Sequence, residues 1–496
     1  MKHTQFKLTA LLMALILTFG AASCGGANGS DETTSGDMTE PVTEKPTVDS
    51  DGYKLDSLPE LDFKGATVQM FVPSTGLEVS EFEMTEQTGD VIDDAVWEKN
   101  THVADRLKIN FEYTTEPGGN ANRFTFADRI KASIMAGDRA YDICAGYSMS
   151  IANLAAAEML TDLNSLQYLD FSQPWWSDGL LTQATVNDKL YFASGDISTN
   201  LIYNMYCVYF NKTQLKNYNL DEPYDLVLEG KWTLDKLIEM SKGKYQDLNG
   251  DSQVDWHDAF GCEIYKVYID MFYQGSGLRT TDDDENGLPV ISKDYSGQKV
   301  HDLVVKLAGF MHDSGDVWAS DYDNSDPKAY FRFEGGNILF SVGEVALGAN
   351  MLRDAKFDYG ILPVPKYDES QENYCTIASF PYILYGIPKD AKDPAMSAAV
   401  IEALGSEAYR TTSPALFEVA LKVKYSSDDQ TAKMYDIIRG SMSWDFGRIF
   451  NDSLSSLTWS MFRNAVSGNN TNWASVFESN KNALETKLAA VVEAMK

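Results

Sequence analysis

Hydrophobic and polar residues alternate with two different periods in the part of the chain that follows residue 60. Residues 66–72, 109–113 and 141–147 are apolar-rich runs of strand length. Between them, apolar residues recur at helical spacing over residues 91–107 and 124–135. This order predicts a βαβαβ unit, and therefore a parallel sheet that helices cover on both faces.

The loops at one edge of this sheet are the first candidates for a binding site. In open α/β sheets, ligands lie beyond the carboxyl ends of the strands. These ends lead into the loop that starts at Pro73 and into residues 146–148, which contain Tyr147. We therefore expect ligand contacts from both loops.

The N-terminus has the pattern of a secretory signal peptide over residues 1–23. Lys2 and Lys7 precede an apolar run that is too short to span a membrane. The small residues before Cys24 resemble a bacterial lipoprotein leader, which implies that Cys24 is lipidated and anchors the protein to the cell membrane. An ordinary secretory leader with an incidental cysteine is the alternative, and both place the protein outside the cytoplasm.

Residues 24–55 differ in composition from the rest of the chain. They are rich in Ser, Thr and acidic residues, with little apolar content. Such a segment cannot bury a core, so it is expected to be a disordered linker between the anchor and a folded body.

The remaining chain is long enough for more than one domain. The 496 residues are 44% apolar and carry a formal net charge of −32, which disfavours binding to nucleic acid. Four cysteines beyond Cys24 are widely spaced without a CxxC pair, which fits neither a zinc site nor a dense disulfide framework. Buried thiols are favoured, and one or two disulfides stay open among Cys144, Cys207, Cys262 and Cys375.

Several short motifs occur in an order typical of one protein family. They are Glu86–Asn100, Ala136–Asp142, Pro174–Trp176, Gly195–Ile197, Val208–Lys212, Trp232–Asp235, Phe357–Pro363 and Pro388–Lys389. Singly these motifs are weak, but they extend in order from about residue 61 to the C-terminus. Together they make the chain resemble family 1 of the bacterial extracellular solute-binding proteins, the carbohydrate-uptake type.

The resemblance implies a two-lobed, periplasmic-binding-protein-like α/β fold of type II. Each lobe would be a mainly parallel sheet flanked by helices, and hinge strands near residues 203–210 and 376–387 would join the lobes. The implied segments are 56–205 (lobe 1), 206–375 (lobe 2), 376–425 (return to lobe 1) and 426–496 (C-terminal helices that pack on lobe 2 and the hinge).

The same resemblance implies a function. Such a protein is not an enzyme: it binds a sugar or oligosaccharide in the cleft between its lobes and delivers it to the permease subunits of an ABC importer. The lobes close around the ligand by a hinge motion.

Sugar recognition needs flat apolar faces and planar polar groups, and the chain contains nine Trp and 26 Tyr. For the tryptophans, burial in the core is the competing interpretation, and for the acids it is the capping of a turn or helix. The candidate ligand-binding residues are Tyr147, Trp175, Trp176, Asp196, Tyr203, Asn204, Glu344, Phe380 and Trp444.

An acidic loop inside the second lobe has the spacing of a calcium-binding loop. Oxygen ligands fall at the first, third, fifth, seventh, ninth and twelfth of twelve positions, the seventh through its backbone carbonyl. Ser252 replaces the usual glycine at the sixth position, which should loosen the site. We expect a structural calcium ion, with a solvated acidic turn as the alternative; the ligands are Asp247, Asn249, Asp251, Gln253, Asp255 and Asp258.

Three other functions compete with uptake. A secreted glycoside hydrolase needs only two carboxylates, and the 73 acidic residues neither exclude nor indicate such a pair. The chain lacks GxSxG, HExxH and GKS or GKT motifs. A structural lipoprotein would be expected to contain repeats, and none is found. Binding of a peptide or amino acid stays open.

Overall fold

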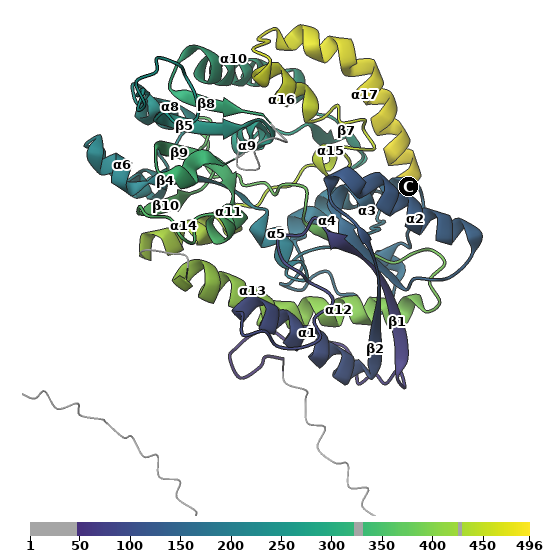
Figure 1. Ribbon diagram of the computed structural model, residues 1–496. Coiled ribbons are helices and arrows are strands. Elements are labelled where there is room, and N and C mark those ends of the chain that lie inside the picture. The colour runs from purple at the N-terminus through teal and green to yellow at the C-terminus, as the bar shows by residue number, and fades with distance from the viewer. Residues whose placement is uncertain (1–46, 322–330, 425–428) are drawn as a thin grey trace, which may run out of the picture. The chain divides into compact units, whose positions relative to one another are not determined.

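The computed structural model describes residues 47–321, 331–424 and 429–496. In this part of the chain two sheets are flanked by helices, as the sequence predicts (Figure 1). We call the four-stranded sheet and its helices lobe 1, and the five-stranded sheet and its helices lobe 2.

The sheet of lobe 1 has the strand order β11-β3-β1-β2. β1 (Ala66–Thr75) pairs in parallel with both β2 (Ile109–Pro117) and β3 (Ile143–Tyr147). The connecting helices are α1 (Val91–Leu107) and α2 (Arg123–Ala136), so the predicted βαβαβ unit is confirmed. β11 (Ile383–Gly386) adds to β3 in the antiparallel direction.

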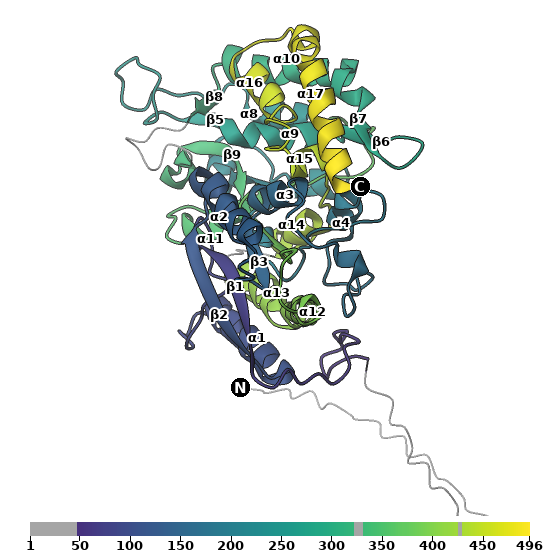
Figure 2. The same ribbon diagram turned by 90° about the vertical axis from the view of Figure 1, so that its right-hand side faces the viewer.

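Local sequence signals explain where the first two helices begin and end. The Asp90 side chain caps α1 by accepting a hydrogen bond from the Ile92 N–H at 2.9 Å. Gly137 ends α2 with a φ of +71°, a left-handed conformation that glycine adopts without strain. The apolar face of α1 is buried and packs beside α12 (Pro394–Arg410), as Figures 1 and 2 show.

The sheet of lobe 2 has the order β10-β4-β9-β5-β8. β5 pairs in parallel with β8 and β9, whereas β4 pairs antiparallel to β9 and β10. The mainly parallel character expected of each lobe therefore holds for the first sheet, and the second is mixed because β4 enters from the other lobe in the opposite direction. The bounds are β4 Tyr206–Asn211, β5 Phe260–Tyr265, β8 Val317–Ser320, β9 Ile338–Glu344 and β10 Tyr359–Leu362.

Helices and short turns complete both lobes, together with a small hairpin of β6 (Thr281–Asp283) and β7 (Pro289–Ile291). The other helices are α3 Ser148–Ala156, α4 Asp178–Ala184, α5 Thr199–Tyr203, α6 Lys212–Asn217, α7 Tyr224–Leu228, α8 Leu234–Ser241, α9 Asp270–Gly275, α10 Gln298–Asp313, α11 Val345–Asn350, α13 Thr412–Pro414, α14 Asp429–Gly440, α15 Phe446–Ile449, α16 Ser460–Ser467 and α17 Trp473–Met495. Single-turn helices are η1 Asn120–Asn122, η2 Leu163–Ser165, η3 Lys266–Ile269, η4 Lys293–Ser296 and η5 Arg332–Gly335, and η6 (Ala415–Lys424) is a π-helix.

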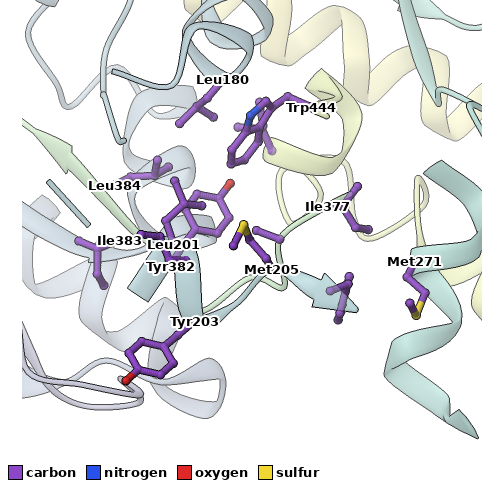
Figure 3. Close-up of a cluster of buried hydrophobic side chains, with 14 of the residues drawn as sticks. Leu180, Leu201, Tyr203, Met205, Met271, Ile377, Tyr382, Ile383, Leu384 and Trp444 are labelled. Atoms are coloured by element: carbon purple, nitrogen blue, oxygen red, sulfur yellow. The ribbon is translucent and has the colours of Figure 1, made fainter. Parts of the chain in front are cut away.

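Three extended segments meet between the sheets, at Met205, at residues 376–378 and at Met442, and we call them the hinge. Met205 and Ala378 form an antiparallel bridge, and Thr376 and Met442 form a parallel bridge. The crossing at Met442 was not predicted from the sequence. Figure 3 shows the apolar packing around these segments, which includes Leu180, Leu201, Met205, Met271, Ile377, Tyr382 and Trp444.

The C-terminal helices contact both lobes. α16 and α17 pack against α10 of lobe 2, and α17 also reaches α3 of lobe 1 (Figures 1 and 2). The apolar stripe predicted for the last helix is confirmed, since it is buried along its length: Leu484, Leu488, Val491, Val492 and Met495.

The end of the expected linker differs from the prediction. Val48 and Lys54 form an antiparallel bridge, and Asp49 accepts the backbone N–H of Tyr53 at 2.9 Å. The Tyr53 ring also lies edge-on to Tyr409, with 5.4 Å between the ring centroids. Residues 47–55 are therefore ordered. The aspartate-capped turn satisfies backbone N–H groups, and the contact with Tyr409 packs the segment against the folded body although it contains few apolar residues.

Candidate functional site

Glu344 lies where the two lobes meet. It is the last residue of β9 and pairs with Tyr206, the first residue of β4 after the hinge. The pKa of Glu344 is raised to about 7, mainly by burial. The charge of Glu78 on lobe 1 contributes to this rise, and a hydrogen bond with Ser379 opposes it. A carboxyl group of lobe 2 is thus within electrostatic reach of one from lobe 1.

Glu78 lies in the loop that follows β1, one of the two loops expected to contact ligand. Its Oε2 accepts a hydrogen bond from Asn350 Nδ2 at 2.8 Å, and Asn350 ends α11 of lobe 2. Burial raises the pKa of Glu78, and this hydrogen bond lowers it in part. Asn200 fixes the loop, because its Oδ1 accepts the backbone N–H of Glu78 at 2.8 Å.

A buried guanidinium lies beside these acids. Arg448 donates to the Ala378 carbonyl from Nε at 3.2 Å and from Nη2 at 2.8 Å, and to Asp270 from Nη1 at 3.4 Å. Its guanidinium carbon lies 4.0 Å from the ring centroid of Phe380 and 4.5 Å from that of Trp459. Arg448 therefore joins the hinge, lobe 2 and the C-terminal segment through hydrogen bonds and cation–π contacts.

Arg463 completes the charged group by donating two hydrogen bonds to Asp270, from Nε at 2.8 Å and from Nη2. Burial alone would lower the pKa of Arg463, but the Asp270 carboxylate raises it overall. One fully buried carboxylate is thus shared by two guanidinium groups.

Tyr147, Met149 and Phe380 form a small buried cluster of their own, separate from the main core. Tyr147 ends β3, at the carboxyl edge of the lobe 1 sheet. All three side chains are buried, and the Phe380 ring connects the cluster to the Arg448 guanidinium.

Asn204 lies at the start of the hinge and is fully buried. Its Nδ2 donates to the Asn200 carbonyl at 2.8 Å, while its Oδ1 has no hydrogen-bond partner among the described residues. Buried polar atoms are normally satisfied, so this acceptor is an exception within the hinge. We call Glu78, Tyr147, Asn204, Glu344, Phe380 and Arg448 the interlobe cluster.

Three of the sequence-predicted residues lie apart from the interlobe cluster, on the side of lobe 1 that faces the hinge. Trp175 and Trp176 are almost completely buried. Asp196 accepts hydrogen bonds from Arg439 and Ser413, each at 2.7 Å. Burial raises the pKa of Asp196 overall, and the charge of Arg439 opposes that rise in part. These residues line a cavity of about 210 Å³, the tryptophan cavity. Its other walls come from Met205 and Met442 of the hinge and from Arg439 of α14, which packs on β10 of lobe 2.

The tryptophan motif and the Gly195 turn pack so closely that only glycine fits between them. A Cβ atom at Gly195 would lie 2.1 Å from the Trp175 carbonyl oxygen, and the Asp196 N–H donates to that oxygen at 2.9 Å. The two sequence motifs therefore meet in space, but in a packing contact within lobe 1.

Tyr203 and Trp444 lie near the hinge and belong to its apolar packing (Figure 3). Tyr203 ends α5. Trp444 packs edge-on against Tyr382, with 5.4 Å between the ring centroids, and covers Gly179 of α4. The predicted set thus divides: Tyr147, Asn204, Glu344 and Phe380 come together, and the other five do not join them.

The sequence did not single out several members of the junction. Glu78 was within reach, since it follows the first strand in a loop already expected to bind ligand. Arg448 comes directly after the stretch that contains Trp444. No local pattern marks the remaining ones, Asp270, Asn350, Trp459 and Arg463.

The acidic loop of lobe 2 has the backbone of a tight, aspartate-capped turn. Asp247 accepts the N–H groups of Gly250 at 2.7 Å and Ser252 at 2.9 Å, and Ser252 has a φ of +63° where calcium loops have glycine. Asp258 is buried and accepts the Tyr245 hydroxyl at 3.1 Å. Among the described residues, no three His, Cys, Asp or Glu side chains are grouped to hold a metal ion. Calcium binding here stays a prediction.

The leader and Cys24 lie outside the described residues. Within the part that is described, no helix has the length and apolar character needed to cross a bilayer. The four other cysteines are free thiols: Cys144, Cys207 and Cys262 are buried, and Cys375 is half-buried.

Comparisons with known proteins agree with this architecture. Residues 83–411 match the family model of the bacterial extracellular solute-binding proteins. No curated protein is similar enough in sequence to be matched.

Three solved structures share the fold at low sequence identity. An ABC substrate-binding protein from Listeria monocytogenes in complex with cycloalternan is 15% identical, with a TM-score of 0.55, over 85% of this chain and 99% of that one. A cyclic α-maltosyl-1,6-maltose binding protein from Arthrobacter globiformis is 14% identical, with a TM-score of 0.56, over 86% and 99%. A maltose-binding periplasmic protein from Listeria monocytogenes is 14% identical, with a TM-score of 0.53, over 86% and 98%. Since the family model covers more than half of the sequence, the chain belongs to the bacterial extracellular solute-binding proteins and has their two-lobed α/β fold.

Proposed function

We propose that the protein binds a sugar or short oligosaccharide between its lobes and delivers it to the permease subunits of an ABC importer, while a lipidated Cys24 holds it at the outer face of the cell membrane. Family membership supports the uptake role. The sugar assignment is supported by structural neighbours that bind cycloalternan and maltose.

The contact between Asn350 and Glu78 is the observation that carries the proposal, because it joins the two lobes beside the interlobe cluster. The interlobe cluster also contains the aromatic rings of Tyr147 and Phe380. A ligand that touches both lobes would favour the closed arrangement over the open one, since it gains contacts only when the lobes approach.

Thermal unfolding of the chain without its leader tests binding. The protein is heated with a panel of mono- and oligosaccharides, and each sample is afterwards checked for cleavage of the sugar. A ligand at 100 times its Kd should add about 2.7 kcal/mol to the free energy of unfolding. An upward shift with intact sugar supports a binding protein; cleaved sugar would indicate a hydrolase, and no response to any sugar would refute the sugar assignment.

Anchoring is tested separately in cells. A Cys24→Ser variant should be released from the membrane fraction while its sugar affinity stays the same, because the anchor and the lobes are separate parts of the chain. Retention of the variant at the membrane would contradict lipidation at this residue.

A further inference from the structure

A buried carboxylate organises the part of lobe 1 that supports two residues of the interlobe cluster. Glu81 follows Glu78 in the loop after β1 and is buried. Its Oε1 accepts the backbone N–H of Asn200 and, at 2.8 Å, the side-chain Nδ2 of the same residue. The hydroxyl groups of Ser198 and Tyr385 donate to the carboxylate, each at 3.1 Å. Glu81 therefore ties its own loop to α5 and to β11.

These hydrogen bonds fix the orientation of the Asn200 side-chain amide. A carboxylate accepts hydrogen bonds and donates none, so the NH₂ end of the amide faces Glu81 and the oxygen faces the loop. Asn200 Oδ1 accepts the backbone N–H groups of Glu78 at 2.8 Å and Val79 at 3.3 Å. Asn200 Nδ2 also donates to the Val79 carbonyl, at 2.8 Å. The amide thus pairs with this loop as a neighbouring strand would.

The main chain of Asn200 holds the residue that precedes the first hinge segment. The backbone N–H and the Nδ2 of Asn204 donate to the Asn200 carbonyl, at 3.0 Å and 2.8 Å. The Asn204 carbonyl in turn accepts the backbone N–H of Ser379 at 2.7 Å, next to the second hinge segment. Asn200 therefore joins two members of the interlobe cluster, Glu78 through its side chain and Asn204 through its carbonyl.

Both side chains of this pair are enclosed by protein, so they do not contact the solute themselves. Asn200 is completely buried and Glu81 is 1% exposed. The Glu81 carbonyl also accepts a hydrogen bond from the buried Lys99 Nζ, at 3.5 Å. Burying charged groups costs free energy, and apolar side chains of similar volume often give the same stability. What the polar pair adds is one defined alignment of residues 78–79 with α5.

We infer that Asn200, with its amide oriented by Glu81, is a positioning residue for solute binding. It holds the Glu78 loop and Asn204 in their binding arrangement before the solute arrives. The inference rests on the proposed function and deepens it by naming residues that act on the interlobe cluster without touching the solute. A site that is ordered in advance binds more tightly, because ordering of the loop no longer opposes binding.

Hydrogen exchange tests the arrangement in the sugar-free protein. The backbone amides of Glu78 and Val79 should be protected in the wild type, since both donate to Asn200 Oδ1. Asn200→Ala removes this acceptor, and both amides should then exchange as fast as those of an open loop. Exchange of both amides at the open-loop rate in the wild type would overturn the inference, whatever the solute is.

Calorimetry with maltose, maltotetraose and cellotetraose tests the effect on binding. Asn200→Ala should lower sugar affinity about tenfold, because two backbone hydrogen bonds that hold the loop are lost. Asn211→Ala is the matched control. Asn211 is also completely buried, and its side chain bonds the Gly336 carbonyl and the Gln214 N–H, each at 3.0 Å, at the end of β4 opposite Glu344. It should lower the melting temperature to a similar extent and leave affinity within about twofold of wild type.

A milder pair of variants applies if Asn200→Ala does not fold. Glu81→Gln keeps the side-chain shape but offers a donor as well as an acceptor, so the Asn200 amide loses its single orientation. Affinity should fall about threefold, and the amides of residues 78–79 should exchange faster. Glu263→Gln should change neither quantity, because this buried acid of lobe 2 accepts hydrogen bonds only from Arg332, Phe333 and Ser341 among the described residues.

The outcomes separate this inference from the function on which it rests. Wild-type affinity in Asn200→Ala, with the two amides exchanging freely, would overturn the positioning role and leave sugar uptake intact. An equal loss of affinity in Asn211→Ala would also overturn it, because the effect would then follow stability alone. If no sugar binds the wild type while the amides are protected, the sugar assignment is refuted and the preformed loop is supported.

Discussion

The tryptophan cavity and the interlobe cluster share one hinge segment but differ in how their carboxyl groups are paired. Met205 lines the cavity, whereas its neighbour Asn204 belongs to the cluster. In the cavity, Asp196 accepts hydrogen bonds from Arg439 and Ser413. In the cluster, Glu344 is within electrostatic reach of Glu78, an acid from the other lobe. Buried polar atoms without a partner among the described residues occur in both places, at the indole nitrogens of the two tryptophans and at Asn204 Oδ1.

This difference shows that conspicuous composition is a poor guide to the site. The paired tryptophans are the more obvious sugar platform in the sequence, but they are buried in lobe 1. The less conspicuous Glu344 lies where the lobes meet. Side chains of the cavity should therefore act mainly on stability, and those of the cluster mainly on ligand affinity.

The largest expected effect comes from Trp175→Ala. Trp175 is completely buried and packs beside Tyr409, with 6.2 Å between the ring centroids. Its truncation should lower the free energy of unfolding by about 3–5 kcal/mol, measured by urea denaturation, because a cavity replaces the indole. Ligand affinity of the folded protein should stay near wild type. Trp256→Ala is the control, since Trp256 is 47% exposed and its truncation should change stability by only about 0.5 kcal/mol.

The opposite outcome for Trp175→Ala would contradict this separation of stability effects in the cavity from affinity effects in the cluster. If affinity fell and stability stayed the same, the tryptophan would be a ligand contact, and the division between cavity and cluster would be wrong.

Glu344→Ala should show the reverse pattern, with affinity lowered about thirtyfold, or about 2 kcal/mol, because a charged hydrogen-bonding partner is lost. Stability should not fall. Burial raises the pKa of Glu344 from an ordinary 4.5 to about 7, so the folded protein binds more protons than the unfolded chain in this range. The wild type thus loses stability as pH rises from 4.5 through 7, and the variant lacks this loss.

Calorimetry and thermal unfolding at pH 8 check both parts of that prediction. An affinity unchanged from wild type, or a melting temperature well below it, would make Glu344 a structural residue like those of the cavity.

Much of the fold was predictable because its signals are local. The apolar face of α1 recurs within a single helix, the Asp90 cap lies two residues from the N–H that it accepts, and Gly137 ends α2 by its own backbone conformation. The stripe on α17 is likewise a property of consecutive turns.

The site was only partly predictable, because its contacts join distant parts of the chain. Asn350 and Glu78 are 272 residues apart, and Arg448 and Asp270 are 178 apart. Asp196 could cap a turn or contact ligand on sequence grounds, and an ion pair with Arg439, 243 residues away, decides its position. No periodicity carries such information, so only the assembled fold separates Glu344 from the many other acids.

A smaller effect is expected at Glu402, a buried acid near the tryptophan cavity. Burial raises its pKa to about 8, and the charges of Asp56 and Asp170 add to this. The wild type should therefore lose stability as pH rises from 4.5 through 8, and Glu402→Gln should reduce that loss by at least about 1.4 kcal/mol, which corresponds to a pKa shift of one unit. Unfolding measured at pH 5, 7 and 9 checks the prediction. The difference should grow with pH, and a difference that shrinks would contradict a raised pKa.

The smallest effect concerns the acidic loop of lobe 2, whose residues take no part in the contacts of the interlobe cluster. If it binds calcium weakly, calcium at about five times its Kd should add roughly 1 kcal/mol to the free energy of unfolding without changing sugar affinity. Asp251→Asn should abolish the response, because the amide keeps the hydrogen bond from the Gln253 N–H but removes a charge. Asp284→Asn, at another aspartate-capped turn, should respond like wild type. An unchanged melting temperature in calcium would mean that backbone N–H groups alone satisfy these carboxylates, and a calcium-dependent sugar affinity would mean that the loop is coupled to the interlobe cluster after all.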